Sequence, residues 1–174
     1  METKTITPGK FGLSYGIILG LIAIVVNVIM YVTGMSLEGV QWPMNIFYLI
    51  FAVFIFYAVS QYKKQNGNLL SLGNALKVGT LIGLISGVVT TIYVLLFNYV
   101  IAPEFMSEMM EMQLDKLREN PDLTEEMIEQ SRSVSEIFMN PFVFSALVLA
   151  SYTFFGFLYS LIAGLIMKKE APQY

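Results

Sequence analysis

The stretch VGTLIGLISGVVTTIYVLLFNYVIAP, residues 78–103, contains no aspartate, glutamate, lysine or arginine. A helix of about 20 apolar residues crosses the hydrocarbon core of a bilayer, so this stretch is long enough to span a membrane. Three further windows share its length and its lack of charge: residues 11–32, 39–62 and 140–167. The sequence therefore predicts an all-α membrane protein with four transmembrane helices, and the lipid bilayer is its first expected partner.

The composition of the whole chain agrees with this class. Of its 174 residues, 56% are hydrophobic and 13% are charged, whereas about 25% of the residues in a soluble domain are charged. The chain contains no cysteine and no histidine, which excludes disulfides, thiol catalysis, Ser–His catalysis and the commonest ligand of zinc and haem. We therefore expect no catalytic residue, no metal and no cofactor, and nothing in the sequence indicates a nucleic-acid partner.

Turn and capping residues predict where the spans begin and end. The first span should cover residues 11–31; a signal peptide, the alternative for this window, has a shorter apolar region and a small-residue cleavage site. The second should begin at Trp42–Pro43 and end at Tyr62, and the third should follow a Ser71 cap and end before Pro103. Asn140 should cap the fourth span, which stops at Lys168–Lys169. We expect one structural domain made of residues 1–102, an exterior segment at 103–140, and residues 141–174.

The basic residues predict the orientation. One side of the membrane would hold seven of them: Lys4, Lys10, Lys63, Lys64, Lys77, Lys168 and Lys169. The other side would hold three: Lys116, Arg118 and Arg132. Positive charge resists translocation, so we expect both termini in the cytoplasm and residues 103–140 outside it.

The exterior segment reads as two amphipathic helices that Asn120–Pro121 separates. In the first, the acidic residues Glu104, Glu108, Glu111, Asp115 and Glu119 form one stripe opposite Met106, Met110, Leu114 and Leu117. In the second, Leu123, Met127, Val134 and Phe138 lie opposite Glu125, Glu129, Arg132 and Glu136. We predict an antiparallel hairpin whose apolar faces cover each other, in preference to lying on the membrane surface or on a partner.

The acidic stripe has two interpretations. It is either a solvated face or a surface that faces a basic partner, and it lacks the D-x-[DN]-x-[DN]-G pattern of a calcium loop. The methionines at 106, 109, 110 and 112 either fill the core of the hairpin, which we favour, or form an adaptable partner-binding surface.

Three of the four spans carry small residues at every fourth position, the pattern of a glycine zipper. They are Gly12, Gly16 and Gly20 in the first span, Gly79, Gly83 and Gly87 in the third, and Gly156, Ser160 and Gly164 in the fourth. In lipid, close approach of helix backbones through such grooves provides van der Waals contact. We predict helix packing within the chain, with a homodimer seam or a substrate path as the alternatives. The second span has no such stripe, and its phenylalanines suit a lipid-facing or space-filling helix.

Polar residues inside the spans are few, and none of them titrates near neutral pH. Proton-coupled transport usually needs an embedded acid or histidine, which these windows do not contain. Asn27 and Thr90 occupy equivalent places in two similar spans and are the one hint of a transport path.

Several segments together resemble a known family. They are the glycine-rich first span, the aromatic second span, KKQNGN at 63–68, SLGNALKVG at 71–79, EFMSEMMEMQ at 104–113, and a last span that ends in two lysines. This pattern is similar to that of the bacterial four-pass membrane proteins grouped as domain of unknown function 4199. The resemblance implies a bacterial inner membrane and carries over no functional residue.

These features favour a non-enzymatic interaction or assembly protein whose exterior hairpin contacts a membrane or periplasmic protein. The alternative is a subunit of a small oligomeric transporter or channel, and both readings allow a homo-oligomer.

Overall fold

The computed structural model of the protein describes residues 7–170; the predicted tail positions at 1–6, with Lys4, and at 171–174 lie outside this range. Within this range, four helices are long and apolar enough to cross a membrane, which confirms the predicted fold class and indicates a multi-pass membrane protein. They are α1 (Pro8–Val32), α3 (Trp42–Gln65), α4 (Leu72–Leu96) and α7 (Pro141–Met167). Their bounds agree closely with the predicted spans because local capping sets them: the side chain of Asn140 accepts hydrogen bonds from the backbone of Phe142 and Val143.

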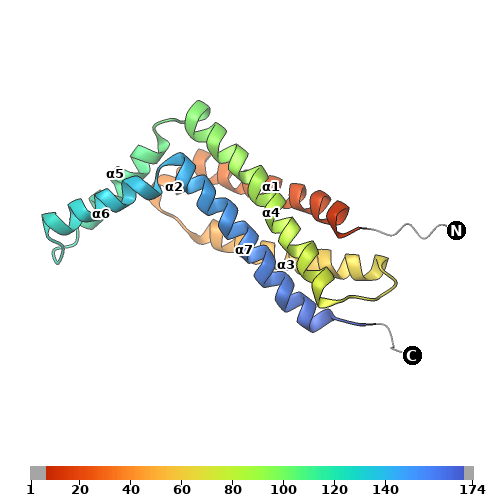
Figure 1. Ribbon diagram of the computed structural model, residues 1–174. Coiled ribbons are helices and arrows are strands. Elements are labelled where there is room, and N and C mark those ends of the chain that lie inside the picture. The colour runs from red at the N-terminus through yellow and green to blue at the C-terminus, as the bar shows by residue number, and fades with distance from the viewer. Residues whose placement is uncertain (1–6, 171–174) are drawn as a thin grey trace.

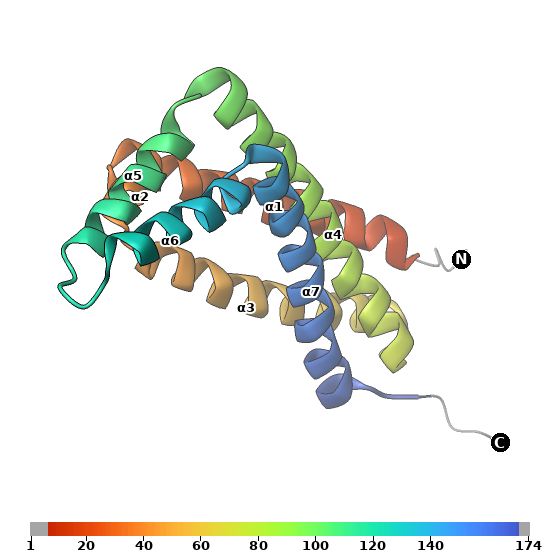
Figure 2. The same ribbon diagram turned by 60° about the vertical axis from the view of Figure 1, so that its left-hand side comes forward.

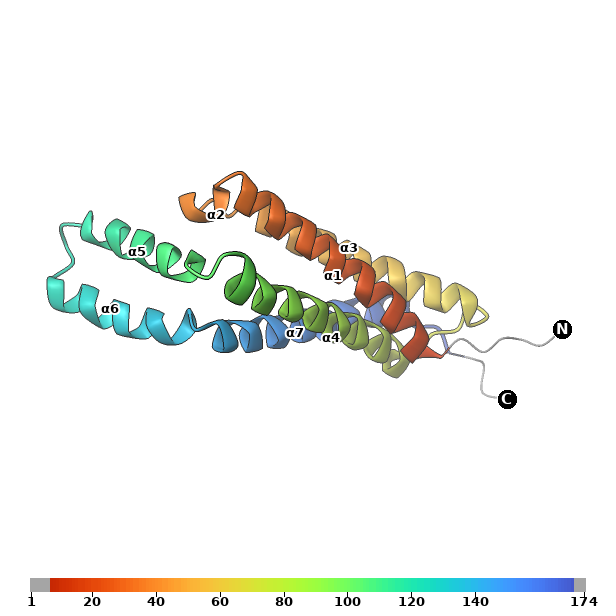
Figure 3. The same ribbon diagram turned by 90° about the horizontal axis from the view of Figure 1, so that it is seen from above.

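The four spans pack around α4 (Figures 1 and 3). Helix α4 contacts both α1 and α7 extensively, and α3 lies against α7 and α1. The start of α1, the turn between α3 and α4 and the end of α7 all lie at one end of the bundle, which we call the lysine end. There Lys63 donates to the backbone oxygen of Met167 at 2.7 Å, and an isolated β-bridge joins Leu70 to Lys169.

Helix α3 is a filler helix rather than a wholly lipid-facing one. Its buried face carries Phe47, Phe51, Ile55 and Val59, each about one helical turn from the next, whereas Leu49 on the other face is exposed. The ring of Phe51 lies 5.6 Å, centroid to centroid, from the rings of both Tyr152 and Tyr159 on α7. Tilted and edge-to-face aromatic contacts therefore join α3 to α7, where no glycine contact occurs among the described residues.

Two short elements and one hairpin make up the opposite end, which we call the hairpin end. Helix α2 (Met35–Glu38) follows α1, and a π-helix, η1 (Phe97–Ile101), extends α4. Helices α5 (Phe105–Arg118) and α6 (Glu125–Phe138) form the hairpin, which bends away from α4 and α7 toward α2 (Figure 2). The side chain of Thr124 caps α6 by accepting from the backbone of Met127.

The apolar faces of the hairpin differ from the prediction. Between the two helices, Leu114 of α5 and Ile128 of α6 are buried, but the predicted face of α6 is not covered by α5. Met127 and Val134 are each 48% exposed and Phe138 is 50% exposed. Ile128, about a quarter-turn away from Met127 around the helix, is the residue that turns toward α5. The predicted stripe on α6 is therefore an outward surface.

Candidate functional site

The small residues of α4 and α7 lie against each other. A Cβ added at Gly83 would overlap the backbone oxygen of Tyr152, and one added at Gly156 would lie 2.6 Å from the backbone oxygen of Gly79. Gly79 also faces Ser160, and Gly87 faces Leu149. Both helices therefore use their missing side chains to bring two backbones into contact, which is the geometry that drives helix association in lipid.

The glycines of α1 and the last glycine of α7 form grooves for side chains of α4. A Cβ added at Gly12, Gly16 or Gly20 would lie 2.6–2.8 Å from the Cβ of Leu81, Ile85 or Val89, in that order. Gly164 of α7 receives Leu72 and Ala75 in the same way. All nine small residues singled out in the sequence thus lie at helix contacts inside one chain.

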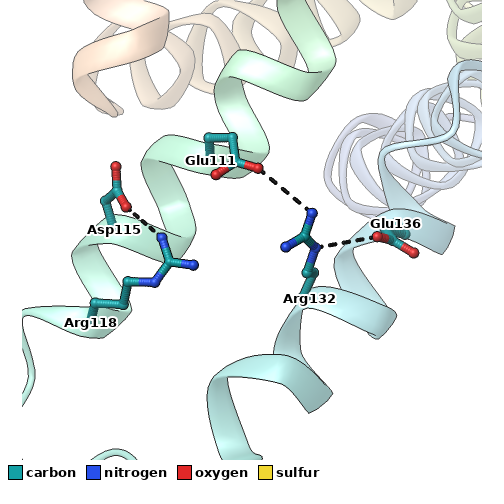
Figure 4. Close-up of polar contacts among 5 residues, drawn as sticks. All are labelled: Glu111, Asp115, Arg118, Arg132 and Glu136. Atoms are coloured by element: carbon teal, nitrogen blue, oxygen red, sulfur yellow. Dashed lines mark hydrogen bonds and ion pairs between the residues drawn. The ribbon is translucent and has the colours of Figure 1, made fainter. Parts of the chain in front are cut away.

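The acidic stripe of α5 faces solvent. Glu104, Glu108, Glu111, Asp115 and Glu119 are all exposed. Two arginines lie among the acids (Figure 4): Arg118 pairs with Asp115 at 2.8 Å, and Arg132 of α6 lies 3.8 Å from Glu111 and 3.5 Å from Glu136. Because these groups are exposed, each pair contributes at most about 1 kcal/mol. The stripe does not gather the ligands of a metal: among residues 7–170, no group of three or more acidic side chains could hold an ion.

A cavity of about 510 Å³ lies between the spans and the hairpin. The ends of α1 and α4, the start of α3, helix α2, η1, α5 and the start of α7 contribute to its wall. Three aromatic rings connect the hairpin to the spans here. The ring centroid of Phe97 on η1 lies 4.8 Å from that of Tyr31 on α1 and 5.3 Å from that of Phe105 on α5. The cavity has the size of common small-molecule sites, which measure about 300–1,000 Å³.

Methionines dominate the apolar wall of this cavity. Six of the eleven in the chain line it: Met30, Met44, Met106, Met109, Met112 and Met139. The sequence predicts that the methionines of α5 fill the hairpin core, but Met106, Met109 and Met112 line this cavity, to which no residue of α6 contributes. Their spacing of three residues along α5 was the available signal, since it places them on one helical face.

Two asparagines, Asn27 and Asn98, contribute polar groups to the cavity wall. Asn98 on η1 is 4% exposed; its amide nitrogen donates to the backbone oxygen of Val94 at 2.8 Å, and its Oδ1 has no partner among the described residues. Asn27 also lines the cavity, whereas Thr90, the other residue of the predicted transport path, does not. Because π-helical turns often occur at functional sites, the position of Asn98 on η1 makes this cavity a candidate functional site.

Lys116 is the one charged side chain in the cavity wall. Its Nζ donates to the backbone oxygen of Glu38 at 3.0 Å, which joins α5 to the last turn of α2. Unlike Arg118 and Arg132, it has no carboxylate within ion-pair distance among the described residues.

Residues 14–169 match the family model for a protein of unknown function, DUF4199. The chain belongs to the DUF4199 family. A search of curated proteins finds no match, and a search of solved structures finds none. In this DUF4199 protein, exposed charge, exposed apolar groups and a cavity occur together at the hairpin end.

Proposed function

We propose that the protein is a non-enzymatic interaction protein of the bacterial inner membrane, with both termini in the cytoplasm and the hairpin of α5 and α6 outside. The hairpin binds the basic surface of a membrane or periplasmic partner. The observation that carries this proposal is the outward face of α6, where four large apolar side chains lie exposed on a strongly acidic hairpin.

The charge of the hairpin supports a basic partner. Residues 103–140 contain ten acidic and three basic residues, a formal net charge of −7, whereas the whole chain has −3. Such a field attracts a positively charged surface and speeds the encounter with it. It also disfavours a second copy of the hairpin, because two surfaces of the same sign would meet.

The apolar residues of α6 supply the contact area that charge alone does not. Met127, Val134, Ile137 and Phe138 are all between 48% and 62% exposed. Exposed apolar groups rimmed by polar ones are typical of protein-binding surfaces. The acids Glu125, Glu129 and Glu136 are exposed on the opposite side of the same helix, so they steer a basic surface toward the hairpin while the apolar face makes the contact.

Photo-crosslinking in cells of origin tests the proposal. A photoreactive residue at Val134 should give a discrete protein adduct, while the same residue at Leu49, exposed on α3, should react with lipid. Changing Glu125, Glu129 and Glu136 to glutamine should weaken the adduct at 134. A product at 134 that contains only lipid or a second copy of the chain would overturn the proposal, as would an adduct that the three glutamines leave unchanged.

A further inference from the structure

We propose that the methionine-lined cavity binds one acyl chain of a membrane phospholipid, whose phosphate interacts with Lys116. This inference is independent of the proposed protein partner, because it concerns the inner side of α5 and not the outward face of α6.

The wall of the cavity suits a flexible apolar chain. Six methionines and five aromatic residues line it, with the side chains of Tyr31, Phe97 and Phe105 forming one wall. Methionine is unbranched and has three rotatable bonds, so a surface rich in it adapts to an irregular or mobile occupant. A chain with many conformations therefore fits this wall better than a rigid polar metabolite does.

Lys116 supplies the polar end of the site. The hairpin holds three basic residues, and the two arginines each meet at least one carboxylate. Lys116 meets only a backbone oxygen, although acids outnumber bases in this segment. Its ammonium retains donors for an anionic oxygen, and it lies on the face of α5 that lines the cavity. Lysine commonly binds phosphate as a point charge.

The depth of the cavity matches the headgroup region of a bilayer. Trp42 at the start of α3 is 57% exposed and Tyr99 on η1 is 52% exposed, and both lie at the hairpin end of the spans. Tryptophan and tyrosine concentrate at the boundary between hydrocarbon and headgroups. A lipid phosphate would thus lie near the level of Lys116, with a chain free to enter among the methionines.

Native mass spectrometry of the purified full chain tests this site. The probe is phosphatidylethanolamine, chosen because a lipid without net charge is not repelled by the −7 hairpin; the control is diacylglycerol with the same chains. We expect one saturable phosphatidylethanolamine per chain, bound about tenfold more tightly than diacylglycerol, the order expected for one charge-assisted hydrogen bond at a partly exposed site.

Variants separate the phosphate contact from a structural role of Lys116. Lys116→Gln should reduce phosphatidylethanolamine binding to the level of diacylglycerol, Lys116→Arg should retain the preference, and Lys64→Gln, an exposed lysine at the other end, should change nothing. Met109→Trp, which fills the cavity, should weaken both lipids.

Three results would overturn the assignment. They are equal binding of the two lipids by the unaltered protein, a preference that survives Lys116→Gln, and displacement of the phospholipid by an equal concentration of oleate, which would identify a free fatty acid as the ligand. If Lys116→Gln does not fold, the comparison of the two lipids and the Met109→Trp variant still decide.

Discussion

Replacing Gly83 by alanine is the sharpest test of the contact between α4 and α7. The added methyl group would overlap the backbone oxygen of Tyr152 and lie 3.0 Å from the Cα of Gly156. Carbon atoms attract each other best at about 3.5–4.0 Å. Since both obstacles are backbone atoms of a helix, neither can rotate away, and the two helices have to separate by roughly 0.5–1 Å.

The cost follows from this separation. A gap of that size forfeits about a quarter to a half of the dispersion attraction of each pair of atoms it opens, and overpacked cores lose about 1–3 kcal/mol. Alanine regains up to about 1 kcal/mol through its higher helix propensity. Both obstacles are backbone atoms, so the upper part of the overpacking range applies, about 2–3 kcal/mol. With about 1 kcal/mol regained, we expect Gly83→Ala to lower the free energy of unfolding by about 1–2 kcal/mol.

Equilibrium unfolding in mixed detergent micelles measures this difference, and α4 contains its own control. Gly73 lies near the start of the same helix, and a Cβ added there would meet no atom within 4 Å. Gly73→Ala should be neutral or slightly stabilising. If the two variants unfold together, the backbones of α4 and α7 do not touch at Gly83, and the packing role of the small residues has to be abandoned.

Three further predictions concern the rest of the molecule. A reporter enzyme that is active only in the cytoplasm should be active when fused at Asn66, and one that is active only after export should be active when fused at Asn120. The reverse pattern would invert the proposed orientation. Phe51→Ala should cost about 3 kcal/mol of stability because the ring is fully buried, whereas Leu49→Ala on the exposed face should cost under about 0.5 kcal/mol; similar losses would place both residues in lipid. Backbone amides in residues 104–139 should be protected from hydrogen exchange in the middle of each hairpin helix, and uniform rapid exchange would contradict a folded hairpin.

The sequence predicts the spans well because their signals are local. Lack of charge sets the length of each span, and caps such as Ser71 and Asn140 act on backbone groups within three residues. The role of the small residues is also predictable from sequence, because their repeated spacing of four residues indicates close packing against another helix. In contrast, the apolar stripe of α6 could not be assigned to a neighbour, because an amphipathic pattern shows that a face is apolar but not what covers it.

The cavity is harder still to predict, because its wall comes from distant segments. Met30, Met44, Met109 and Met139 are separated by as many as 109 positions, yet they line one space. No periodicity relates residues on different helices. The bend at Ala102 (φ −140°, ψ 73°), between η1 and α5, decides the outcome, since it turns α5 toward α2 and places three methionines of the hairpin in one wall with Met30 and Met44.

The two ends of the bundle differ in a way that restricts where a ligand or a partner can bind. At the lysine end, Lys63 and the bridge between Leu70 and Lys169 tie the chain segments together, and the glycine contacts of α4 leave no room between the helices. At the hairpin end, large side chains take the place of the glycines: the rings of Tyr31 at the end of α1 and Phe97 of η1 lie 4.8 Å apart, centroid to centroid, and six methionines line the cavity beside them. Small residues allow backbone contact, whereas methionines and aromatic rings separate backbones and leave space that a flexible molecule can fill. The change from glycine to methionine along the same bundle therefore closes one end by backbone contact and leaves a cavity at the other.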